Sequence, residues 1–209
     1  MKSFNSLQLS SFWGWLFLLY MIITDQQKID SLKYAVTQVN NGKAYKRFNE
    51  SKEQQIERWY IGKLGEMVFF NLLAKNGILI DYSGLFSYQA DEYDFLMPFR
   101  QLKIDVKTCS PFDRYLLVPK EQMLNIAKID IYVGVIVDEK NSKGFVDGYI
   151  HKQNLIKNSS EKVSKSMPEG ECYNARLVDL KSIDKLLQYW YFFLDCIEFQ
   201  KAHKPYPVI

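Results

Sequence analysis

Apolar positions in the first third of the chain recur at intervals of three and four residues, as on one face of a helix. The range Asp25–Asn40 shows this spacing and is followed by an Asn-Gly pair, which commonly ends helices. A stronger pattern follows the polar stretch Lys43–Glu53 and lasts until a second Asn-Gly pair at positions 76 and 77. Its apolar positions are Ile56, Tyr60, Leu64, Met67, Phe70 and Leu73. We therefore predict two consecutive helices.

Beyond position 77 the apolar residues form short runs or alternate with polar residues, which is the spacing of β-strands. The strand candidates are Ile78–Tyr82, Asp91–Pro98, Gln101–Ser110, Tyr115–Val118, Ile129–Val137, Phe145–His151 and Tyr173–Val178. A tight turn near Phe99–Gln101 predicts an antiparallel hairpin between the second and third of these. The segment Ile129–Val137 is almost continuously apolar, which is typical of a buried central strand.

Three further helices are expected in the second half of the chain. They are Pro119–Lys128, a short helix within Asn154–Gly170, and the amphipathic segment Asp179–Leu194. The sequence shows no internal repeat and no interdomain linker. We predict one α/β (α+β) domain at residues 25–200, with a central mixed sheet of four to six strands flanked by helices, and a tail at residues 201–209.

The N-terminal segment, residues 1–24, contains the charge-free apolar run Phe12–Ile23. The run is shorter than the roughly 20 apolar residues of a membrane span. A secretory signal is disfavoured because Lys2 is the only charge before the run and no small-residue cleavage site follows it. Three interpretations remain: a marginal membrane anchor, a helix packed on the domain, or a translated extension upstream of a start at Met21. For an anchor, Lys28 and Lys33 outweigh Lys2 and predict a cytoplasmic domain.

The amino-acid composition limits which kinds of partner and metal site the chain can have. The chain has 209 residues, of which 47% are hydrophobic and 24% charged, and this balance disfavours extensive disorder. The net charge of +3 permits a polyanionic partner without demanding one. Three separated cysteines and two histidines argue against a disulfide framework, a zinc knuckle and a histidine-rich metal site. Any metal ion is therefore expected to be bound by carboxylates, which favours Mg²⁺ or Mn²⁺.

One strand candidate, Gln101–Ser110, carries charged residues on one face. Because side chains alternate along a strand, Asp105 and Lys107 project from the same face. Asp94 lies on the strand expected to pair with it, and Glu66 lies on the helix before that. Each of these residues alone is more often an ordinary surface charge. Together, four such groups on three successive elements indicate a metal-dependent nuclease site.

These residues suit phosphodiester hydrolysis, which needs an activated water and neutralised charge on the transition state and the leaving oxygen. Asp94 and Asp105, on neighbouring strands, can converge on one cation, with the backbone carbonyl of Val106 as a further oxygen ligand. Glu66 can reach the same point directly or through water. Lys107 would then position or deprotonate the attacking water.

Three short motifs occur in a set order. They are GKLGE at Gly62–Glu66, YDF at Tyr93–Phe95 and IDVKT at Ile104–Thr108, and a predicted helix and a buried strand follow them. In this order they resemble the PD-(D/E)xK nuclease superfamily, whose core is a helix with a glutamate, a hairpin with an aspartate and a strand with D/E-x-K. The resemblance covers about residues 59–138, and it departs from the family where Tyr93 replaces the proline.

The resemblance implies a restriction-endonuclease-like core and a Mg²⁺-dependent nuclease (Mn²⁺ as an alternative) that acts on DNA. It implies catalytic roles for Glu66, Asp94, Asp105 and Lys107, with metal ligation by the three acids and the carbonyl of Val106. Homodimers are common among the family's double-strand cutters. The alternative function is a catalytically silent nucleic-acid-binding or assembly module on the same fold.

Weaker candidates surround the motifs. Gln122 lies on the predicted helix after the site strand, where members of the superfamily place a polar residue, and Thr108 directly follows the lysine. Basic residues that flank the motifs and can contact phosphates are Arg58, Lys63, Arg100, Arg114 and Lys120. Each of these has an ordinary structural explanation as well. Glu92, in register with Asp94, is an alternative ligand.

Two glycines, Gly62 and Gly65, lie inside the second predicted helix. A glycine in a helix interior costs roughly 1 kcal/mol relative to alanine, so the pair requires a reason. Either another backbone, protein or nucleic acid, approaches closely at this point, or the helix is tightly packed.

Overall fold

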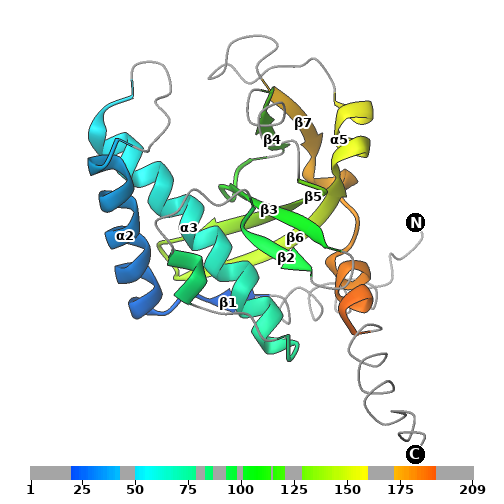
Figure 1. Ribbon diagram of the computed structural model, residues 1–209, viewed down its shortest axis with the longest axis horizontal. Coiled ribbons are helices and arrows are strands. Elements are labelled where there is room, and N and C mark those ends of the chain that lie inside the picture. Colours follow the sequence, from blue (N-terminus) through cyan, green and yellow to red (C-terminus); the bar gives the residue numbers. More distant parts are fainter. Residues whose placement is uncertain are drawn as a thin grey trace, which may run out of the picture.

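A five-stranded mixed sheet forms the centre of the described part of the chain, as Figure 1 shows. The computed structural model describes residues 20–42, 50–78, 83–86, 93–97, 101–113, 115–120, 129–159 and 172–191. Within these ranges the protein is an α/β structure, in which the five-stranded sheet curls, a two-stranded sheet lies beside it, and four helices pack on them. The predicted class and strand number are confirmed.

The large sheet combines one parallel pair with three antiparallel pairs. Its order is β1 (Tyr20–Ile22), β6 (Lys143–His151), β5 (Ile131–Asp138), β3 (Leu102–Cys109) and β2 (Phe95–Met97). The β3–β5 pair is parallel, and β2 pairs antiparallel with β3. The predicted hairpin and the buried central strand, β5, are therefore confirmed. The hairpin strand β2 is shorter than predicted, because Asp94 precedes it and residues 98–100 lie outside the described part.

Two capped helices precede the sheet strands. Helices α2 (Asp25–Asn40) and α3 (Lys52–Lys75) each begin with a capping box, in which Thr24 or Ser51 and the glutamine three residues later satisfy each other's backbone N–H groups. Past each C-terminus, Gly42 and Gly77 have φ angles of +67° and +71°, which glycine adopts without steric cost. Both predicted helices are confirmed, although residues 43–49 lie outside the described part.

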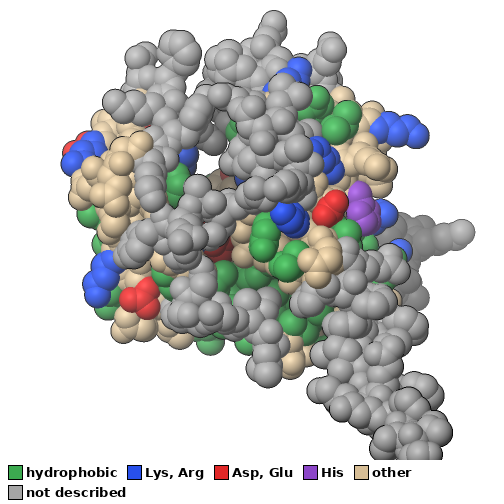
Figure 2. Space-filling view, in the orientation of Figure 1, with side chains coloured by type: hydrophobic (Ala, Val, Ile, Leu, Met, Phe, Trp, Pro, Cys, Tyr) green, Lys and Arg blue, Asp and Glu red, His purple; other side chains and the backbone are tan. Residues whose placement is uncertain are grey.

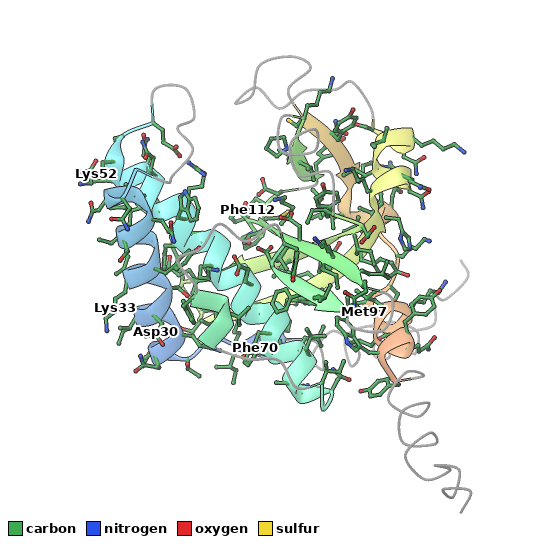
Figure 3. All side chains as sticks on the ribbon, in the orientation of Figure 1. Asp30, Lys33, Lys52, Phe70, Met97 and Phe112 are labelled. Carbon is green, nitrogen blue, oxygen red and sulfur yellow. The ribbon has the colours of Figure 1, made fainter. Side chains whose placement is uncertain are left out.

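The apolar stripe of α2 faces outward. Ile29, Leu32 and Val36 are exposed, and Lys33 also lies on the outer side of the helix (Figure 3). The side that faces α3 is instead polar or small, with Gln27, Ser31, Tyr34, Ala35 and Gln38 buried. The amide of Gln27 donates a hydrogen bond of 2.8 Å to Asn71 of α3. The buried face of α2 is therefore the one that carries the Gln27–Asn71 hydrogen bond and the packing of Tyr34 on Trp59 of α3.

Helix α3 packs on the face of the sheet that carries Ile104 and Val106. Its approach to β3 is so close that a Cβ atom at Gly65 would lie 1.9 Å from Oγ1 of Thr108. At Gly62 a Cβ atom would meet nothing within 4 Å. Of the two reasons considered for these glycines, close packing against a strand holds at Gly65. Nothing in the structure explains Gly62.

The two-stranded sheet closes a second core on the other face of the large sheet. It pairs β4 (Tyr115–Pro119) with β7 (Cys172–Arg176), so neither predicted strand extends the large sheet. This core also takes residues from β3, β5, β6 and helix α5 (Lys152–Asn158). The predicted helix Pro119–Lys128 lies outside the described residues after Lys120. The last helix starts at residue 183 and not at Asp179, because Leu177–Asp179 forms a 3-10 turn.

The end of the N-terminal apolar run is a strand and not a helix. Tyr20–Ile22 pairs with β6, and Met21 and Ile23 are buried in the main core. These last residues of the run are therefore part of the sheet edge. The anchor, packed-helix and upstream-extension interpretations concern mainly residues 12–19 and stay predictions. Residues 1–19 lie outside the described part. Among the described helices, none has the length and apolar character to cross a membrane.

Replacing Gly65 by alanine is expected to destabilise the protein by about 1–3 kcal/mol, because the new methyl group must displace Thr108 or shift the helix. The matched control is Gly62→Ala three residues earlier, which has room and should stabilise the helix by about 1 kcal/mol. Urea unfolding of both variants measures the two free energies. Equal effects of the two substitutions would contradict the close α3–β3 contact.

Candidate active site

Asp94 closes the end of the β2–β3 pairing with its backbone and its side chain. Its N–H donates to the carbonyl of Ile104 at 3.0 Å, and its Oδ2 accepts the N–H of Val106 at 2.7 Å. The carboxylate thus takes the place that the next residue of a partner strand would occupy. Because the N–H and C=O groups of one strand residue point to the same side, the carbonyl of Val106 faces Asp94 as well.

Asp105 and Lys107 form an ion pair on one face of β3, as the alternation predicts. Lys107 Nζ lies 2.6 Å from Asp105 Oδ2, and only 17% and 12% of the two side chains is exposed. The contact has the distance of an ion pair but not the angles of a hydrogen bond, so Asp105 Oδ2 is buried without a hydrogen-bond donor among the described residues. Both residues lie opposite β5, in register with Tyr132 and Gly134.

Glu66 reaches the cluster from the middle of α3. Its Oε2 lies 2.5 Å from Nζ of Lys63, one turn earlier on the same helix. Its carboxylate also interacts electrostatically with Asp94, Asp105 and Lys107. The four residues predicted from sequence to form one site therefore lie within electrostatic range of one another. Figure 2 shows acidic side chains set back from the surface near the middle of this face of the molecule.

The acids of this cluster disfavour each other's charge. Burial raises the pKa of Glu66, and the positive charge of Lys63 only partly opposes this. Burial and the negative charges of Glu66 and Asp105 together raise the pKa of Asp94 well above its usual value, although Lys107 and the N–H of Val106 act in the opposite direction. A further cation in the cluster would relieve this repulsion.

The donor set suits a hard divalent cation. Asp94, Asp105 and Glu66 supply carboxylate oxygens, and Asp105 Oδ2 has an ion pair with Lys107 but no hydrogen-bond donor among the described residues. Among the described residues, however, no three His, Cys, Asp or Glu side chains already have an arrangement that holds a metal ion. Val106 N–H contacts only Oδ2 of Asp94 and Lys63 contacts only Oε2 of Glu66, so each carboxylate has a second oxygen that can bind a metal ion while these contacts persist.

The weaker candidates are placed elsewhere or lie outside the described part. Oγ1 of Thr108 donates to the carbonyl of Gly62 at 3.3 Å and faces α3, and Lys120 lies over the ring of Tyr173 at 5.6 Å. Arg58 forms a two-pronged ion pair with Glu50. Lys63 is buried. Glu92, Arg100, Arg114 and Gln122 fall outside the described residues.

From the sequence, Lys63 is either a phosphate contact or the surface ion-pair partner of Glu66; the structure shows the pair with Glu66 but places the ammonium inside. It donates to Glu66 and, at 2.8 Å, to the carbonyl of Leu85, and it lies 4.3 Å from the ring centre of Tyr34. The sequence signal for this role was its position three residues before Glu66, where helix side chains are neighbours. Its burial depends on Tyr34 and Leu85, which are distant in the sequence.

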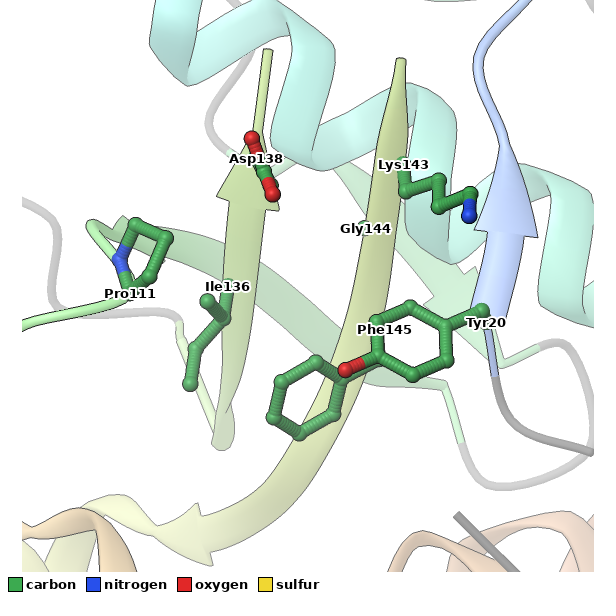
Figure 4. A pocket seen from close by; sticks show the side chains of 7 residues that line it. All are labelled: Tyr20, Pro111, Ile136, Asp138, Lys143, Gly144 and Phe145. Carbon is green, nitrogen blue, oxygen red and sulfur yellow. The ribbon is translucent and has the colours of Figure 1, made fainter. Parts of the chain in front are cut away.

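A separate pocket of about 80 Å³ lies at the far end of β5 and β6. Figure 4 shows Asp138 and Lys143 at its rim, with Tyr20, Ile136 and Phe145 along its wall. None of the proposed site residues lines it. This pocket therefore contributes nothing to the acidic cluster.

Comparisons with protein-family models, with curated proteins and with solved structures give no match. The relation to the PD-(D/E)xK nucleases thus remains a resemblance in motif residues and their order.

Asp94→Asn is expected to stabilise the metal-free protein above the ordinary pKa of an aspartate. Because the folded-state pKa of Asp94 is raised, ionisation costs folding free energy, and this cost grows as pH rises from the unfolded-state pKa through the folded-state pKa. Asparagine removes the charge and still accepts the N–H of Val106. In EDTA at pH 8 the Asp94→Asn variant should melt at a higher temperature than the wild type, by about 2–4 °C for each kcal/mol of repulsion that the substitution relieves. Near pH 4 the two proteins should melt at the same temperature.

The control for this measurement is Glu57→Gln, an exposed acid on helix α3. It should leave the melting temperature nearly unchanged across the same pH range. An Asp94→Asn protein that melts below the wild type at pH 8 would show that the charge of Asp94 stabilises the fold.

Proposed function

We propose that this chain is a Mg²⁺-dependent nuclease that hydrolyses the phosphodiester bonds of DNA. One observation carries the proposal: Glu66 of α3, Asp94 directly before β2, and Asp105 and Lys107 of β3 interact in one largely shielded cluster in which the acids repel each other. Buried like charges cost stability, and such costs concentrate at functional sites. If the cluster only stabilised the fold, the pairs Lys63–Glu66 and Lys107–Asp105 would be enough. Asp94 is a third acid, and in such a cluster it would only add repulsion.

The topology supports a restriction-endonuclease-like core. The helix with the glutamate, the hairpin with the aspartate and the strand with D-x-K follow one another as in the PD-(D/E)xK nucleases. The parallel pairing of β3 with β5 requires a crossover connection between these strands, which residues 110–130 provide. Asp105 and Lys107 lie on β3, next to the central strand.

Each residue of the cluster has a distinct task in this proposal. Asp94 and Asp105, with Glu66 and the carbonyl of Val106, bind the metal ion. When bound, Mg²⁺ supplies neutralisation of phosphate charge and a lower pKa for water. Lys107 is held against Asp105 at 2.6 Å, which places its ammonium inside the cluster, where a positive charge can orient a water or a phosphate oxygen.

The same cluster leaves a second candidate function open to test. Glu66 is already neutralised by Lys63, an arrangement that a silent nucleic-acid-binding or assembly module could retain without metal. Binding of DNA without cleavage in either Mg²⁺ or Mn²⁺ would favour this module over the nuclease.

Asp105→Asn and Lys107→Met should each reduce Mg²⁺-dependent DNA cleavage at least about 100-fold while the protein stays folded, because each removes a ligand or the group that orients the nucleophile. The assay is nicking or linearisation of plasmid DNA in Mg²⁺, with EDTA as a blank and circular dichroism as the folding check. Lys103→Met is the matched control. It lies two residues before Asp105 on the same strand face, with its ammonium over the ring of Tyr93 at 4.9 Å.

Cleavage by the control variant should stay close to that of the wild type. The nuclease assignment fails if cleavage persists in both Asp105→Asn and Lys107→Met, or if Lys103→Met lowers it as strongly as they do.

A further inference from the structure

A lysine side chain is buried beside the acidic cluster and is not used in the proposed hydrolysis. Lys63 is 6% exposed and lies in the middle of α3. Its ammonium contacts Glu66 Oε2 at 2.5 Å and the carbonyl of Leu85 at 2.8 Å, and it lies over the rings of Tyr34 and Phe86 at 4.3 and 5.9 Å. The ammonium is therefore held from several sides at one position.

These contacts keep Lys63 charged. Burial lowers its pKa, but Glu66, Tyr34 and Asp94 outweigh this effect and leave the pKa raised. A buried ammonium is costly unless it is paired and hydrogen-bonded, so this position is built for a cation. Because the charge of Asp94 acts on Lys63 as well as that of Glu66, Lys63 belongs to the electrostatics of the whole cluster.

The charges of the cluster limit what it can bind. Among the residues that the structure describes, the ionised side chains of Glu66, Asp94 and Asp105 carry three negative charges, and Lys63 and Lys107 carry two positive ones. These five side chains together leave a single net negative charge. One divalent cation reverses this charge to a single positive one. A second divalent cation would leave three positive charges in a buried place, which Coulomb repulsion opposes strongly.

We propose that Lys63 is a positioning residue that acts as a built-in cation: it holds Glu66 and restricts the cluster to one divalent metal ion. The inference rests on the proposed function, because it assumes that the acids bind a metal ion. Lys63 thereby competes with the metal ion for Glu66, and it fixes the carboxylate when the metal ion does not bind it directly.

The test is a titration of the full chain with Mn²⁺ alone, by calorimetry and by electron paramagnetic resonance of free Mn²⁺. The wild type should bind one ion per chain. Lys63→Met, which preserves the length of the side chain without its charge, should bind a second ion or bind the first about tenfold or more tightly, since one repelling charge is gone. In the same variant Mg²⁺-dependent cleavage should fall, because Glu66 loses its anchor.

A purely structural role for Lys63 would not make metal binding tighter while activity falls. Two further variants sharpen the test. Lys63→Gln is also uncharged but can still donate hydrogen bonds, and it replaces Lys63→Met if that protein does not fold. Lys63→Met combined with Glu66→Gln restores the original net charge, so it should bind one ion and no second ion, with an affinity lowered by the loss of the Glu66 ligand.

Two outcomes overturn this inference but not the proposed function. In the first, the wild type cleaves DNA and binds two ions. In the second, the uncharged variants fold and bind the same number of ions as the wild type with the same affinity. The wild-type stoichiometry decides by itself if neither uncharged variant folds. A wild type that binds no Mn²⁺ overturns both the inference and the proposed function. Loss of binding in Asp105→Asn assigns the ion to this cluster, and unchanged binding there also overturns both.

Discussion

Burial of three carboxylates within range of one another is the constraint on which this structure depends. Water screens Glu66, Asp94 and Asp105 only weakly, so each acid depends on the positive or N–H groups that the described part of the fold supplies. Lys63 forms an ion pair with Glu66, the N–H of Val106 donates a hydrogen bond to Asp94, and Lys107 forms an ion pair with Asp105. For Glu66 and Asp94, burial and the neighbouring acids outweigh these partners and raise the pKa.

The fold brings these groups together through two close contacts. Gly65 lets α3 approach β3 until the backbone of Gly62 accepts a hydrogen bond from Thr108, and this approach places Glu66, the next residue after Gly65, beside the strand. The β2–β3 pairing ends at Asp94, whose side chain binds Val106 instead of a further strand residue. The α3–β3 packing and the β2–β3 pairing thus fix the positions of the site residues. The same contacts prevent the acids from moving apart.

The periodic patterns predicted the local structure well, because they reflect short-range rules. The bounds of α2 follow from a capping box and a terminal glycine, and those of β5 and β6 from apolar runs and turns. The same-face position of Asp105 and Lys107 follows from strand alternation alone. The boundary of β2 was missed because Asp94 uses its side chain, and not its backbone carbonyl, to bind the N–H of Val106.

The sequence by itself determined the helices, the main strands and the four residues of the candidate site, because spacing and turn residues act over a few positions. Only the tertiary structure decided that the apolar stripe of α2 faces outward, that β4 pairs with β7, that Tyr20–Ile22 forms an edge strand and that Lys63 is buried. Each of these depends on partners far along the chain, such as Asn71 for α2 and Leu85 for Lys63. No local pattern encodes which of these distant groups meet, since the free energy of the whole packing selects them.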